Sequence, residues 1–107
     1  MRNALHGHED DCVLWNDLGV ILWRAGKLRD AEAALRNAII LRPGYDEAKT
    51  NLSSLLASRG FYRQALRIEE ELISGRPLHR DFHERRMEEY RKAIAELEKE
   101  NRDEGQE

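Results

Sequence analysis

Side chains that could bind a metal ion are concentrated near the N-terminus. His6, His8, Glu9, Asp10 and Cys12 fall close together in the sequence. Imidazole, carboxylate and thiolate groups are all zinc ligands, but protein zinc sites place their ligands at characteristic spacings, and this group has none of those spacings. We therefore predict no metal site and no cofactor.

Nucleophilic chemistry has no support in the sequence either. Cys12 is the single cysteine, and no histidine follows at a spacing that marks a cysteine nucleophile. A glycine-rich phosphate loop and a Ser–His–Asp signature are also missing from the sequence. We predict no catalytic residues and a protein that is not an enzyme. One cysteine also excludes an intramolecular disulfide and fits a reducing compartment.

Two further clusters of titratable residues lie in the C-terminal half. His79 and His83 are four residues apart, but Asp81 and Glu84 form a capping box that would leave His79 outside the helix. We predict that both histidines face solvent. The acidic run 69–71 is predicted to be a solvated helix face.

The elements that carry these side chains follow a repeat of 34 residues. This spacing separates Gly26 from Gly60, and two copies run over residues 12–45 and 46–79. A fixed period of this length is typical of helical hairpins stacked in an array. Three further pairs keep the spacing: Leu18 and Leu52, Ala31 and Ala65, Pro43 and Pro77.

The first copy resembles the tetratricopeptide repeat. The order that carries this resemblance is Trp15, Leu18-Gly19, Leu22, Ala31, Leu35, Ala38 and Pro43, with leucines where the family usually has Tyr and Phe. The resemblance implies an all-α fold of antiparallel helical hairpins in a short right-handed superhelix. It also implies a scaffold that binds other proteins.

The second copy departs further from the family pattern. It keeps Leu52, Leu56, Gly60, Ala65 and Pro77. Lys49 stands in place of the Trp, Ser53 in place of the Gly, and Glu69 in place of a large apolar residue. We expect the neighbouring Ile68 to supply the contact that Glu69 cannot make.

Periodicity and helix-ending residues predict five helices, at about 12–25, 28–41, 46–58, 62–74 and 81–100. Asp11 is the predicted N-cap of the first helix, and Gly26 and Gly60 are predicted to end helices. The predicted domain organisation is a flexible tail over 1–11, repeats at 12–45 and 46–79, a capping helix at 80–100 and a frayed tail at 101–107.

Composition narrows the classes of partner. Charged residues make up 36% of the chain, the net charge is −3, and acidic and basic residues alternate. A nucleic-acid-binding domain usually shows a basic stripe, so we predict no nucleic-acid partner. No apolar run is long enough to span a membrane, and the first residues lack the apolar core of a signal peptide. We predict a cytoplasmic protein.

The first predicted helix is unusually apolar. From Val13 to Trp23, eight of eleven residues are apolar, and a helix that is apolar on all sides should be buried. No earlier hairpin covers it in this sequence. Three possibilities remain for what buries this helix: the N-terminal residues through Leu5, another protein, or upstream repeats that were removed. Leu14 and Ile21 are the predicted self-association residues.

Two functions remain open from the sequence. The first is a protein-interaction scaffold that binds a partner peptide or helix in a groove lined by the first helix of each repeat. The alternative is a structural module whose apolar first helix forms a homodimer interface. The predicted partner-binding residues are Val13, Asn16, Val20, Trp23, Arg24, Glu47, Thr50, Asn51, Ser54 and Ser58.

Overall fold

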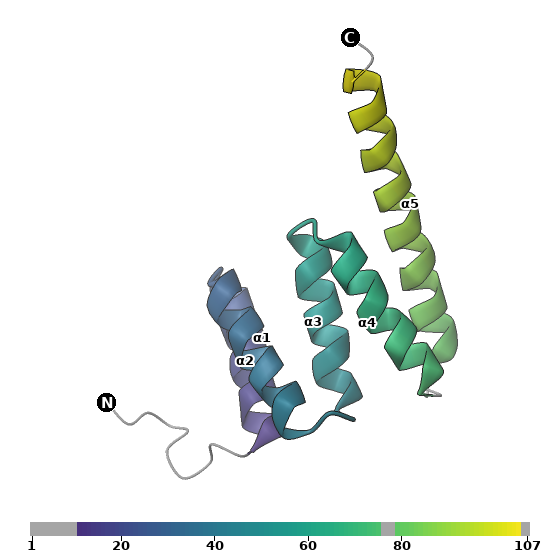
Figure 1. Ribbon diagram of the computed structural model, residues 1–107. Helices are drawn as coiled ribbons and strands as arrows, with labels where there is room; N and C mark the ends of the chain where they lie inside the picture. The colour runs from purple at the N-terminus through teal and green to yellow at the C-terminus, as the bar shows by residue number, and fades with distance from the viewer. Residues whose placement is uncertain (1–10, 76–78, 106–107) are drawn as a thin grey trace. The chain divides into compact units, whose positions relative to one another are not determined.

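The computed structural model describes residues 11–75 and 79–105, with side chains as far as Asn101. Within these ranges the chain forms five α-helices and no strand (Figure 1). They are α1 (Cys12–Arg24), α2 (Leu28–Leu41), α3 (Asp46–Ser58), α4 (Tyr62–Ser74) and α5 (Arg80–Gly105). The predicted all-α fold is confirmed. The break predicted near Pro77 and the tail 1–10 lie outside the described residues.

Helix ends follow the predicted residues at three positions. The Asp11 carboxylate accepts hydrogen bonds from the backbone N–H groups of Val13 (2.9 Å) and Leu14 (3.3 Å), which makes it the N-cap of α1. Gly26 and Gly60 have φ angles of 79° and 86°. This left-handed conformation is strained for residues with a Cβ, so glycine is favoured after α1 and α3.

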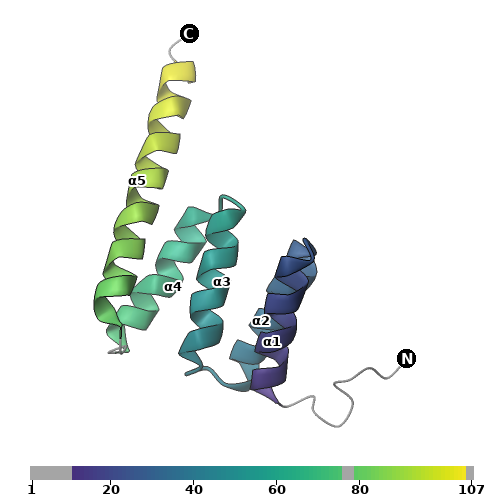
Figure 2. The same ribbon diagram turned by 180° about the vertical axis from the view of Figure 1, so that it is seen from behind.

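The chain divides into two compact units at the boundary between Leu55 and Leu56, inside α3. In the first unit, α1 packs on α2 (Figure 2). A Cβ on Gly19 would lie 2.7 Å from Leu35 Cγ and 3.3 Å from the Ala31 carbonyl oxygen. Only glycine therefore permits this close approach of α1 and α2. Ala31, Ala34, Leu35 and Ala38 form the buried side of α2.

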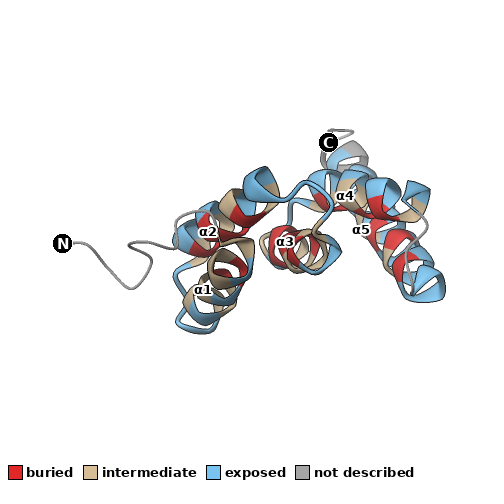
Figure 3. Cartoon of the chain, turned by 90° about the horizontal axis from the view of Figure 1, so that it is seen from below, coloured by how far each residue is buried: buried red, intermediate tan, exposed pale blue. Residues whose placement is uncertain are grey.

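In the second unit, α4 packs on α5. Ala65 and Leu72 of α4, with Met87 and Tyr90 of α5, supply buried apolar side chains, and buried positions line one side of each helix (Figure 3). The Tyr62 and Tyr90 rings lie 6.2 Å apart. With 26 residues α5 is twice as long as α4, which has 13. Its C-terminal part therefore continues beyond the first turn of α4.

The start of α5 differs from the prediction by one residue. Because the helix begins at Arg80, Asp81 lies in its first turn and is not its N-cap. The C-terminal end also differs, since helix continues from Glu100 to Gly105. The division of the chain into two repeats, a capping helix and tails stays a prediction.

Candidate protein-binding surface

The predicted partner-binding residues lie on α1 and α3 and differ in how accessible they are. Asn16 is buried, with 1% of its surface exposed. Ser58 is exposed at the last residue of α3, in the second unit. The remaining residues belong to the first unit: Val13, Arg24 and Glu47 are exposed, while Val20, Trp23, Thr50, Asn51 and Ser54 are half-buried.

A chain of hydrogen bonds links α1 to α3 inside the first unit. Asn51 Nδ2 donates to Asn16 Oδ1 at 3.0 Å, and Asn16 Nδ2 donates to the Tyr45 hydroxyl oxygen at 3.5 Å. The Tyr45 hydroxyl in turn donates to Glu47 Oε2 at 3.3 Å. Burying an amide without partners is costly, and these bonds satisfy both ends of the Asn16 side chain. Asn16 therefore orients Asn51 instead of meeting a partner directly.

This chain of bonds fixes the orientation of the Asn51 amide. One N–H of Asn51 is used by Asn16, which leaves the carbonyl oxygen and the second N–H as further hydrogen-bonding capacity on a half-buried side chain. An acceptor beside a donor matches the N–H and C=O groups of a peptide backbone. The α1 and α3 surface thus contains one oriented amide suited to main-chain recognition.

Tyr45 keeps its proton well above neutral pH. Burial raises the pKa of Tyr45, and the nearby Glu47 carboxylate raises it further because a second negative charge is disfavoured there. The phenol therefore remains a hydrogen-bond donor to Glu47. It holds one end of the chain of bonds in a single direction.

Thr50 has a different local role from Asn51. Its hydroxyl donates to the Asp46 carbonyl oxygen at 2.8 Å, within its own helix. Hydroxyl groups in helices commonly bond back to the preceding turn in this way. The Thr50 oxygen is therefore engaged locally, and the polar character of the surface near it comes mainly from Asn51 and Glu47.

The predicted self-association residues differ in exposure. Ile21 is 61% exposed, whereas Leu14 is half-buried. Val13, two turns before Ile21, is also exposed. Among the described residues, α1 therefore presents apolar side chains to solvent. The predicted cover by Leu5 lies outside the described residues.

A buried polar cluster in the second unit was not predicted from the sequence. Glu69 has no exposed surface; its Oε2 lies 2.6 Å from His83 Nδ1, and its Oε1 accepts from Arg86 Nε at 2.9 Å. Arg86 Nη2 also donates to the Tyr90 hydroxyl at 2.5 Å. The prediction of a solvated face at 69–71 is therefore wrong for Glu69. The prediction that His83 faces solvent is also wrong, while His79 is exposed.

The repeat itself contained the signal for this cluster. Glu69 stands 34 residues after Leu35, and both side chains are fully buried. Repeat position therefore predicted burial correctly, and the charge of the residue led the interpretation away from it. Ile68, expected to replace the missing contact, is half-buried. The bonds of the carboxyl to His83 and Arg86 explain how a glutamate occupies a core position.

Two classes of site are missing from the part of the chain that the structure describes. No group of three or more His, Cys, Asp or Glu residues there is placed to hold a metal ion. The N-terminal cluster of His6, His8, Glu9 and Asp10 lies outside that part. None of the described helices combines the length and apolar character needed to cross a membrane.

Comparison with known proteins gives three related matches. The chain is 34% identical to a peroxisomal targeting signal receptor of Candida albicans, 31% to that of Kluyveromyces lactis and 33% to that of Eremothecium gossypii. Each match covers 78 residues, which is 73% of this chain and 13% of the relative. The chain thus spans a small part of each receptor. No family model and no solved structure matches. The five helices are consistent with tetratricopeptide-like repeats.

Proposed function

We propose that this chain is a non-enzymatic protein-interaction module that binds an extended peptide across α1 and α3 of the first unit. The observation that carries the proposal is the Asn16–Asn51 hydrogen bond of 3.0 Å, which orients one amide on this surface. An extended peptide leaves backbone N–H and C=O groups unpaired, and Asn51 can both donate to and accept from them. Val20 and Trp23, half-buried on α1, would supply apolar contact beside it.

The similarity to targeting signal receptors supports a ligand class. A peptide ending in Ser-Lys-Leu is a peroxisomal address, so we propose that signals of this kind are ligands of the α1 and α3 surface. Glu47 is exposed on this surface and gives it an acidic group for the lysine of the signal. The Tyr45 hydroxyl donates to this carboxylate and holds it in place.

Fluorescence anisotropy with a labelled peptide ending in Ser-Lys-Leu tests the proposal. We expect Asn51→Ala to raise Kd, because the loss of one or two hydrogen bonds costs about 0.5–1.5 kcal/mol each and about 1.4 kcal/mol is tenfold in Kd. Asn16→Ala should also raise Kd, since it removes the group that orients Asn51. Asn37→Ala on α2 makes the same chemical change away from this surface and should leave Kd unchanged.

Two results would count against the proposal in different ways. Equal Kd values for wild type and Asn51→Ala would place peptide binding elsewhere on the chain. At about 1 mM peptide even weak specific binding is detected. If the wild type does not bind the Ser-Lys-Leu peptide at this concentration, signals of this kind are excluded as ligands. The same peptide with its terminal residues scrambled controls for nonspecific binding.

Self-association through the first helix is the second candidate function. The 61% exposure of Ile21 favours it, because contact with a second chain would remove this large apolar side chain from water. In the homodimer form of this hypothesis, Leu14 and Ile21 of one copy meet the same residues of another. Ile21→Asp should then weaken self-association in sedimentation equilibrium over a concentration series, and unchanged association would exclude this interface.

A further inference from the structure

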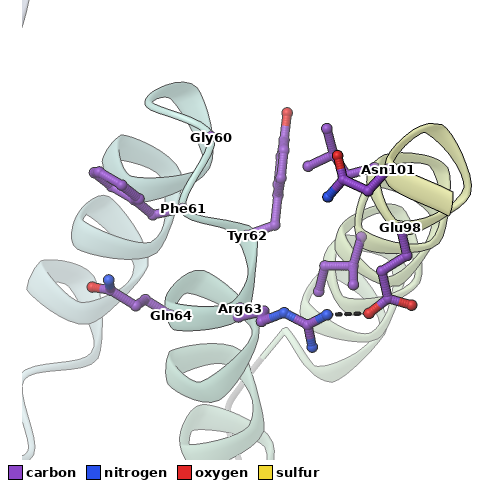
Figure 4. A pocket seen from close by; sticks show the side chains of 9 residues that line it. Gly60, Phe61, Tyr62, Arg63, Gln64, Glu98 and Asn101 are labelled. Carbon is purple, nitrogen blue, oxygen red and sulfur yellow. Dashed lines mark hydrogen bonds and ion pairs between the residues drawn. The ribbon is translucent and has the colours of Figure 1, made fainter. Parts of the chain in front are cut away.

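Polar contacts of two different kinds join α4 to α5. Toward the C-terminal end of α5, Arg63 reaches across from α4 to Glu98, as Figure 4 shows, and both side chains are exposed. The guanidinium and the carboxylate satisfy each other there. Near the start of α5 the contact is buried and joins Glu69 to His83. Because an imidazole has two ring nitrogens, this second contact leaves one nitrogen of His83 to account for.

Glu69 determines which nitrogen of His83 carries the proton. The Oε2 atom of Glu69 lies 2.6 Å from His83 Nδ1, and its Oε1 atom accepts from Arg86. A carboxylate paired with a guanidinium is only an acceptor, so His83 Nδ1 is the donor. In the neutral ring the lone pair then belongs to Nε2, which is the nitrogen left for a metal ion.

His83 Nε2 reaches the surface although the ring is almost buried. The side chain is 6% exposed, and the hydrogen bond of its ring uses Nδ1. Within the described residues, no buried side-chain nitrogen or oxygen lacks a hydrogen-bond partner. Nε2 therefore accounts for part of the remaining exposure, and a ligand can approach it from solvent.

His79 lies one helical turn before His83. The backbone N–H of His83 donates to the His79 carbonyl oxygen at 3.2 Å, so the helical hydrogen-bond pattern includes His79 although α5 begins at Arg80. Side chains at this spacing lie on one side of a helix, with Cβ atoms about 5–6 Å apart. His79 is exposed, so its ring can turn toward His83 without leaving a packed position.

We propose that His79 and His83 bind one Zn²⁺ ion at the start of α5. Imidazole is a preferred ligand of zinc, and two histidines four residues apart on one helix face can hold one ion. A histidine that binds zinc almost always donates its other ring N–H to a carboxylate, a carbonyl or water, and Glu69 makes this contact with His83. Glu69 is thus a positioning residue that orients the ring and strengthens Nε2 as a ligand.

The charges around the two rings permit a cation to bind. Arg86 is paired with Glu69 at 2.9 Å, and Arg80 is paired with Glu84 at 2.7 Å. Neither guanidinium therefore presents an uncompensated positive charge. Two protein ligands leave the other positions of tetrahedral zinc to water, so binding should be weaker than at a structural site with four protein ligands. The inference does not rest on peptide binding at Asn51.

Isothermal titration calorimetry of the full chain with Zn²⁺ tests the proposal. His6 and His8 could also bind zinc, so the parent protein for all titrations is the His6→Ala/His8→Ala variant. We expect the parent to bind one Zn²⁺ ion. Mg²⁺ is the control ion and should not bind, because it prefers oxygen ligands.

Two substitutions in this parent separate the direct ligand from the positioning residue. Loss of a carboxylate partner typically lowers metal affinity by about 10–100-fold, so Glu69→Gln should raise Kd by this factor, and Glu70→Gln is its exposed control. His79→Ala removes a direct ligand and should raise Kd at least as much. Since Glu69→Gln also disturbs a buried cluster, His79→Ala decides the test. Its circular dichroism should be unchanged, because His79 is exposed.

Nitrogen NMR of the histidine rings gives a readout that a purely structural role of Glu69 would not change. Zn²⁺ should shift the Nε2 resonance of His83 while Nδ1 stays protonated. Three results would overturn the proposal. The parent does not bind at about 1 mM Zn²⁺, where even weak specific binding is detected. Equal Kd values for His79→Ala and the parent place the ion elsewhere. A shift of Nδ1 in place of Nε2 contradicts the role of Glu69.

Discussion

Replacement of Glu69 by alanine should destabilise the protein far more than a surface substitution. The Glu69 carboxyl is fully buried and contacts His83 at 2.6 Å and Arg86 at 2.9 Å. Removing one member of a buried ion pair costs about 3–5 kcal/mol, because its partner remains buried without compensation. His83 is 5% exposed and has little access to water. We therefore expect Glu69→Ala to lower the free energy of unfolding by about 3–5 kcal/mol.

Glu70→Ala is the matched control, since Glu70 is exposed and adjacent on the same helix. Surface substitutions of this kind usually change stability by less than about 0.5 kcal/mol. Urea unfolding followed by the far-ultraviolet circular dichroism of the helices measures both variants, and hydrogen exchange of the α5 backbone amides locates the loss. Equal unfolding free energies for Glu69→Ala and Glu70→Ala would refute the buried cluster and restore the interpretation of 69–71 as a solvated face.

A triple substitution tests whether the same cluster stabilises the fold. Glu69→Leu together with His83→Leu and Arg86→Met replaces the buried charges by apolar groups. Such replacements are often neutral or stabilising by about 1–4 kcal/mol. We therefore expect urea unfolding of the triple variant to require at least as much urea as the wild type. A loss as large as that of Glu69→Ala would show that the cluster itself stabilises the fold.

Three further perturbations follow from the first unit. Gly19→Ala should cost about 1–3 kcal/mol in urea unfolding, because the added methyl overlaps the buried Leu35 side chain. Gly26→Ala should cost about 1–2 kcal/mol for another reason, the φ angle of 79°, since its Cβ would meet no atom within 4 Å. In the folded state burial and the Glu47 carboxylate raise the pKa of Tyr45 above its ordinary value of about 10. The contribution of Tyr45 to the free energy of unfolding should therefore be fully present below about pH 10 and be lost as pH rises through the folded pKa. Tyr45→Phe should reduce the loss of unfolding free energy that urea melts show above about pH 10. An unchanged pH profile would contradict a raised pKa of Tyr45.

Local signals were sufficient to predict most of the helix boundaries. Asp11, Gly26 and Gly60 each act through their own backbone and nearest neighbours, and a single sequence shows such effects directly. The bounds of α2, α3 and α4 agree with the prediction for the same reason. The start of α5 was misjudged by one residue because Asp81 and Glu84 have the spacing of a capping box, although Asp81 lies inside the first turn.

The interactions between helices were harder to predict. Asn16 was predicted to line a groove, but its burial depends on partners 29 and 35 residues away, Tyr45 and Asn51. Glu69 meets His83 and Arg86 of α5, and the sequence of α5 does not keep the residue pattern of the two repeats. Neither polarity nor period identifies such partners, because both depend on how two separate helices face each other.

Glu69 also makes α4 and α2 unequal partners for the last helix. The helices α2 and α4 are similar in length. They differ at one repeat position, which holds Leu35 in α2 and Glu69 in α4. If α5 packed on α2 of its own or a neighbouring chain, His83 and Arg86 would be buried against a leucine with no carboxyl group to receive them. Mispairing would thus carry an electrostatic penalty that correct pairing avoids. Repeat proteins tend to exchange similar elements when they fold at high concentration. Under those conditions the buried carboxyl of Glu69 would favour pairing of α5 with α4 of its own chain.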